Sequence, residues 1–94
     1  MPALSFTVEL PDGVRKECYS PSNIVQNYFR VGEQMAVSEF LLRSREAFAR
    51  ASERVQQKFG FACSAASAQL ERIEEWTRDY PPEGTVRIIE LKPS

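Results

Sequence analysis

The stretch SEFLLRSREAFARASERVQQKFG, residues 38–60, carries the clearest structural signal in this chain. Apolar side chains recur in it at intervals of three and four residues, which is the spacing of one face of an α-helix. Ser38 is of a type that caps helix N-termini, and Gly60 stands where a helix commonly ends. We therefore predict a helix from Ser38 to Phe59. The residues that recur at this spacing, which form its core stripe, are Phe40, Leu41, Ser44, Phe48, Ala51, Val55 and Phe59.

Charged residues cover the remaining sides of this helix. Glu39/Arg43 and Glu46/Arg50 stand four residues apart in the order that favours ion pairs. Several basic residues also fall on nearly one line, but glutamates flank that line. Such a mixture is typical of a solvated face and does not indicate a nucleic-acid site. The basic line consists of Arg43, Arg50, Arg54 and Lys58.

A second amphipathic segment spans about residues 64–79, and Pro81-Pro82 ends it because proline cannot continue a helix. Trp76 lies at the edge of its apolar stripe. A shorter helix is predicted after Ser20-Pro21, with Ser20 as N-cap and Pro21 at the first helical position. The stripe of the 64–79 helix consists of Ala66, Leu70, Ile73, Thr77 and Tyr80, and that of the short helix of Ile24, Val25 and Tyr28.

Strands are predicted at both ends of the chain. Residues 3–10 alternate between apolar and polar, which is typical of a half-buried strand. The turn residues 11–13 lead into a second strand at 14–19. A β-branched run from Thr85 to Leu91 predicts the last strand.

These elements follow the order β-β-α-α-α-β, and they predict one α+β domain over residues 1–94. We expect a three-stranded, mainly antiparallel sheet with the helices packed on one face. The predicted core consists of Phe6, Val8, Leu41, Phe48, Val55, Leu70, Ile73 and Ile88.

The overall composition is that of an ordinary globular domain. The chain has 94 residues, 12 basic and 13 acidic, so its net charge is −1 and gives no long-range attraction to nucleic acid. No apolar run approaches the roughly 20 residues of a membrane span, and the N-terminus does not have the pattern of a signal peptide. We therefore expect a cytoplasmic protein that binds neither nucleic acid nor membrane.

Two cysteines, Cys18 and Cys63, are the candidate reactive groups. Cys63 precedes a predicted helix start, where backbone N–H groups can lower the pKa of a thiol. The alternative is that both are small buried apolar residues. The chain has no histidine and no phosphate-binding glycine loop, and no carboxylate pair stands out as a catalytic dyad. We assign no catalytic residue, no metal site and no cofactor.

Leu42 and Ala49 lie off the core stripe of the long helix, with Arg45 beside them, and Trp76 lies at the edge of its stripe. Leu42, Arg45 and Trp76 are the candidate interaction surface. The apolar pair Leu42 and Trp76 can face a partner, or it can contact the short helix or the terminal strand. Three short strands would also leave exposed edges, which proteins tend to cover or pair. We therefore expect a homodimer.

Three segments resemble the small nitrogen-starvation-response proteins of bacteria. They are FTV with PDG at residues 6–8 and 11–13, CYSPS at residues 18–22, and the run from Ser44 through FGFACS at residues 59–64. The resemblance covers most of the chain. It implies a place beside gene clusters that encode a nitrilase, a radical-SAM protein, an acetyltransferase and a flavin-dependent oxidoreductase. It implies no reaction and no catalytic residue.

Together these observations predict a non-enzymatic accessory or interaction protein in a nitrogen-starvation response, with protein partners that include products of a nitrilase-type cluster. The alternative is a small thiol-dependent enzyme or redox-sensing module that uses Cys18 and Cys63. A third hypothesis is a regulator that binds a small molecule.

Overall fold

The N-terminal hairpin follows the alternating pattern of the sequence. The computed structural model describes residues 3–60 and 64–93. In it, β1 (Leu4–Glu9) and β2 (Arg15–Ser20) pair antiparallel, with Phe6 opposite Cys18. Because side chains alternate across a strand, the apolar residues of β1 all point to one face of the sheet.

Within the described residues the sheet has four strands in the order β2-β1-β4-β3, and the prediction of three strands is wrong. β4 (Thr85–Pro93) lies between β1 and β3 and is antiparallel to both. The missed strand is β3 (Gln34–Ala36). It has only three residues, of which Met35 alone is buried, so no alternation can reveal it in the sequence.

The first predicted helix is a short 3-10 helix, η1 (Asn23–Asn27), so the prediction of three α-helices is also wrong. Its N-cap is Ser22 and not Ser20: the Ser22 hydroxyl accepts the Ile24 N–H at 3.3 Å. The Ser20 hydroxyl instead donates to the Ser22 carbonyl at 2.6 Å, which tightens the turn after β2. With only five residues, the segment suits a 3-10 turn better than an α-helix.

The two long helices are present, as α1 (Val37–Phe59) and α2 (Ser64–Arg78). α1 ends as predicted, because Gly60 adopts a φ of 79° and its N–H donates to the Gln56 carbonyl. Ser38, however, does not cap the start. The backbone N–H groups of residues 37 and 38 instead donate to the carbonyls of Gly84 and Pro82, at 2.7 and 3.1 Å. The loop before β4 therefore caps the N-terminus of α1 through its backbone carbonyls.

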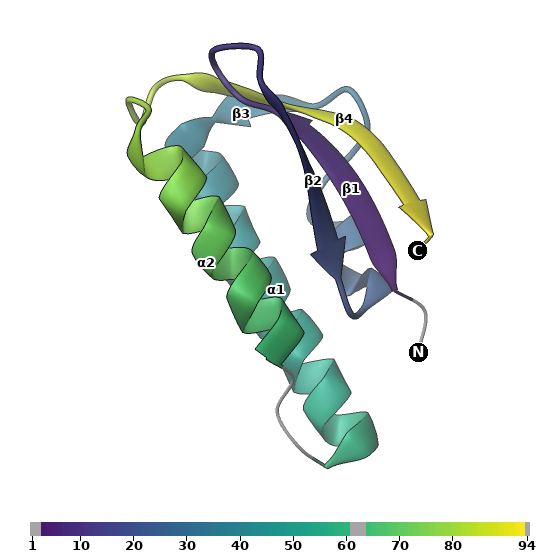
Figure 1. Ribbon diagram of the computed structural model, residues 1–94. Coiled ribbons are helices and arrows are strands. Elements are labelled where there is room, and N and C mark those ends of the chain that lie inside the picture. The colour runs from purple at the N-terminus through teal and green to yellow at the C-terminus, as the bar shows by residue number, and fades with distance from the viewer. Residues whose placement is uncertain (1–2, 61–63, 94) are drawn as a thin grey trace.

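α1 and α2 form a helical hairpin that lies against one face of the sheet, as predicted (Figure 1). The other face carries polar side chains, including those of Thr7, Glu17 and Glu90, which pair in one row across three strands. None of the helices in the described ranges is long and apolar enough to span a membrane.

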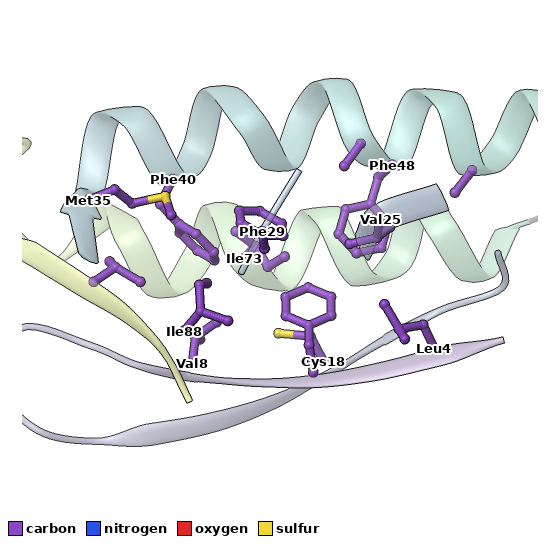
Figure 2. Packing of buried hydrophobic residues seen from close by; sticks show 14 of the residues in the cluster. Leu4, Val8, Cys18, Val25, Phe29, Met35, Phe40, Phe48, Ile73 and Ile88 are labelled. Carbon is purple, nitrogen blue, oxygen red and sulfur yellow. The ribbon is translucent and has the colours of Figure 1, made fainter. Parts of the chain in front are cut away.

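The core is built around phenylalanine rings from three parts of the chain. Phe6 stacks on Phe29 with ring centroids 5.6 Å apart, and Phe29 lies 5.6 Å from Phe40. Phe6 also lies 6.2 Å from Phe48. Figure 2 shows the α1 side chains pointing toward those of the strands, with Ile73 of α2 beside them. Six of the eight predicted core residues are buried, while Leu41 and Leu70 are half-buried against the cluster.

Arg43 fastens the irregular segment between η1 and β3 to α1. Its guanidinium bonds the predicted partner Glu39 at 2.9 Å, and also Glu33 at 2.9 Å and the Tyr28 carbonyl at 3.3 Å. The hydrogen bond from Arg43 lowers the pKa of the Glu33 carboxyl below its usual value. The second predicted pair, Glu46 and Arg50, forms no ion pair in the described ranges.

Replacing Phe48 with alanine should destabilise the fold by about 3–5 kcal/mol, because it opens a cavity where α1 meets the sheet. The free energy of unfolding from urea titration measures this change. Val31→Ala is a suitable control, since Val31 is 61% exposed and its truncation should change stability by less than about 0.5 kcal/mol. Similar losses in both variants would show that Phe48 is not part of the core.

Candidate functional site: a groove between the two helices

A groove of about 370 Å³ runs between α1 and α2 and opens to solvent. It forms because small side chains face each other where the helices approach: Ala49 and Ser52 on α1, and Ala66 and Ser67 on α2. Phe48 and Ala66 are buried in its floor, and Leu70 is half-buried. The full lining consists of Arg45, Phe48, Ala49, Ser52, Glu53, Gln56, Ala66, Ser67 and Leu70.

Charged side chains of both signs stand at the rim. Arg45 and Glu53 are both exposed and lie two turns apart on α1. The Arg45 guanidinium bonds the Glu74 carboxylate of α2 at 3.0 Å, so it also joins the two helices. An ion pair as exposed as this one contributes little to stability. Arg45 and Glu53 therefore remain accessible to a partner molecule.

Two of the three predicted surface residues, Leu42 and Arg45, lie next to each other in the structure. Leu42 is 60% exposed on α1, one turn before Arg45, so both lie along the same side of the helix. Trp76 lies on the side of α2 that meets β2. It is half-buried against the core, and the Lys16 ammonium of β2 stands 5.4 Å from the centroid of its ring. These contacts account for Trp76, whereas the interaction role of Leu42 and Arg45 stays a prediction.

Gln69 is a buried polar residue that sequence reasoning missed. Its side-chain oxygen accepts the Tyr19 N–H at 3.0 Å, which brings α2 over the free edge of β2. Its Nε2 is buried without a hydrogen-bond partner among the described residues. The available signal was a polar residue next to the apolar stripe of the 64–79 segment, which usually means an exposed position.

Cys18 is 1% exposed and lies among the core side chains (Figure 2). In the hairpin it pairs with Phe6 of β1. Burial, together with the nearby Glu17 carboxylate, raises the pKa of its thiol to about 12. Since only the thiolate is nucleophilic, such a thiol is inert near neutral pH. This placement favours the packing interpretation of Cys18. Cys63, the other candidate thiol, lies outside the residues that the structure describes.

The CYSPS segment acts in the described structure as a connection. The Ser20 hydroxyl accepts the Ser22 N–H at 3.2 Å in addition to the bond that it donates. Both serines are fully buried. Over residues 3–60 and 64–93, no group of three or more cysteine or acidic side chains is placed to hold a metal ion.

Fold and groove together define a small α+β domain with a helical hairpin that is open to solvent on one side. The sequence matches the family described as nitrogen starvation-induced protein NitG over residues 5–91, and the chain belongs to that family. No curated protein and no solved structure matches it. The match confirms the resemblance to nitrogen-starvation proteins. The association with nitrilase-type gene clusters stays a prediction.

In the native protein, Cys18 should react with iodoacetamide at neutral pH at least about a hundredfold more slowly than in the unfolded chain, because its thiolate is scarce and covered. A Cys63→Ser variant leaves Cys18 as the single thiol, and mass spectrometry follows its alkylation. Equal rates in native and denatured protein would contradict the buried, raised-pKa state of this thiol.

Proposed function

We propose that this chain is a non-enzymatic accessory protein of a bacterial nitrogen-starvation response that acts in the cytoplasm by binding other protein chains. The observation that carries the proposal is the open groove between α1 and α2, with Leu42 exposed beside it. Helical grooves with exposed apolar side chains are common sites of protein contact. Membership of the nitrogen starvation-induced family supports the physiological setting.

The roles of the other polar groups support the same proposal. Ser20 and Ser22 bond each other in a turn, Arg43 joins α1 to an irregular segment, and Gln69 joins α2 to β2. The raised pKa of Cys18 makes its thiol a poor nucleophile. These groups are thus engaged in holding the fold, while the rim of the groove offers exposed charges for recognition.

A regulator that binds a small molecule is the second candidate function. The groove volume of about 370 Å³ falls within the range of ligand sites, roughly 300–1,000 Å³. Most ligand sites bury the ligand on several sides, however, whereas this groove is open along the exposed side of the hairpin. We therefore favour a protein partner. The thiol-dependent alternative now depends on Cys63.

The test is a pulldown from nitrogen-starved cells with the tagged protein as bait. We expect it to recover products of a nitrilase-type gene cluster, which are the partners that the resemblance implies. A Cys63→Ser bait should recover the same proteins in similar amounts, because the proposed contact needs no thiol chemistry. Cells grown with ample nitrogen serve as the control for proteins that bind without regard to starvation.

Two results would overturn the proposal. One is a pulldown in which no cluster product is enriched by the starved-cell bait. The other is fast, selective alkylation of Cys63 in the native protein near neutral pH, combined with loss of the captured proteins in the Cys63→Ser bait. That combination would favour the thiol-dependent function.

A further inference from the structure

A row of residues along the exposed side of α1 has the spacing of a helix–helix contact. Leu42, Arg45, Ala49, Ser52 and Gln56 follow one another at intervals of three and four residues. This is the heptad spacing with which one helix packs along another. All but Ser52 are exposed, and the last four line the groove. The row is therefore a largely solvent-exposed seam along the groove, in which Arg45 also pairs with Glu74 of α2.

The charges on this seam are symmetric about Ala49. Arg45 precedes Ala49 by four residues, and Glu53 follows it by four. Leu42 precedes it by seven residues, and Gln56 follows it by seven. Ala49 itself has a small side chain, which permits the backbones of two helices to approach closely at this point.

A two-fold axis at Ala49 would use this symmetry. In an isologous pair, each contact occurs twice, once from each copy. With the two α1 helices antiparallel, Arg45 of each copy lies opposite Glu53 of the other, which makes two complementary charge pairs. A parallel pair would instead bring Arg45 against Arg45 and Glu53 against Glu53, which is repulsive. The charge pattern thus selects the antiparallel arrangement.

The apolar part of the seam fits the same arrangement. Leu42 of one copy falls at the level of Gln56 of the other, and Gln56 lines the groove. The groove has room for a leucine side chain, and Leu42 is the most exposed leucine on this helix. Burying it twice across the axis removes two apolar side chains from water.

We propose that the exposed side of α1 binds a second copy of this chain, antiparallel and centred on Ala49, to form a homodimer. The sheet edges are a poorer route to a dimer, because α2 reaches the β2 edge through Gln69, and β3 is only three residues long. A second copy would occupy the same groove that the proposed function uses, so another protein would have to displace it; ultracentrifugation of the pure protein and the pulldown test the two proposals separately.

Analytical ultracentrifugation of the pure protein from about 1 to about 100 µM tests the interface. The unaltered chain should dimerise. Arg45→Glu and Glu53→Arg should each weaken the dimer by about tenfold or more, because each places like charges opposite each other at two points. An equimolar mixture of the two variants should dimerise again, since opposite charges then face each other at both points. Circular dichroism checks that each variant is folded.

A matched alanine pair tests the position of the axis. Ala49→Arg should abolish the dimer by placing two bulky charges at the axis. Ala68→Arg, at an exposed alanine of α2 that does not line the groove, should leave it unchanged.

Three outcomes would overturn the proposal: a monomer throughout the concentration range, a dimer indifferent to the Arg45 and Glu53 reversals, or a mixture of the reversals that stays monomeric. If the pure chain is monomeric and Ala49→Arg removes a captured protein from the pulldown, the groove holds a different protein and not a second copy.

Discussion

The contact among four phenylalanine rings is the constraint on which the rest of this structure depends. Phe6 comes from β1, Phe29 from the segment after η1, and Phe40 and Phe48 from α1. Their centroids lie 5.6–6.2 Å apart in successive pairs, a distance at which aromatic rings attract one another. Because the rings belong to different elements, the cluster sets both the distance of α1 from the sheet and its rotation about its own axis. The other buried apolar residues of α1, Val37, Ala47, Ala51 and Val55, are consistent with the same rotation.

The rotation of α1 decides what the protein shows to solvent. With Phe40 and Phe48 directed inward, helical geometry turns Leu42 and Ala49 outward. α2 then packs beside α1 and reaches β2 through Gln69. The small side chains at the junction of the helices leave it unfilled, which produces the groove. The candidate interaction surface is thus a direct consequence of how the core is packed. Arg45 and Glu53 place a positive charge toward one end of this surface and a negative charge toward the other.

Several polar side chains that could bind a ligand or react instead hold irregular parts of the chain in place. Ser20 and Ser22 close the turn after β2, and Arg43 ties the approach to β3 onto α1. The Cys18 thiol is buried, and its pKa is about 12. The described residues of this member of the nitrogen starvation-induced family thus form a well-packed scaffold with an open groove between its two helices. This arrangement suits a protein that works through contacts with other chains.

Local sequence patterns by themselves determined the two long helices, the first and last strands and most of the core. In these elements one face is buried, so apolar residues recur along the sequence at the spacing of the helix or the strand. They also marked Leu42 and Arg45 as surface residues. They did not reveal β3, whose pairing to β4 depends on residues about fifty positions away, or the start of α1, whose N–H groups are satisfied by the loop before β4. They also did not reveal that Trp76 is half-buried or that Gln69 is buried and bonds the Tyr19 N–H. Both lie on the side of α2 that meets β2, and only the packing of α2 against that strand decides which side chain is covered and which backbone group needs a partner.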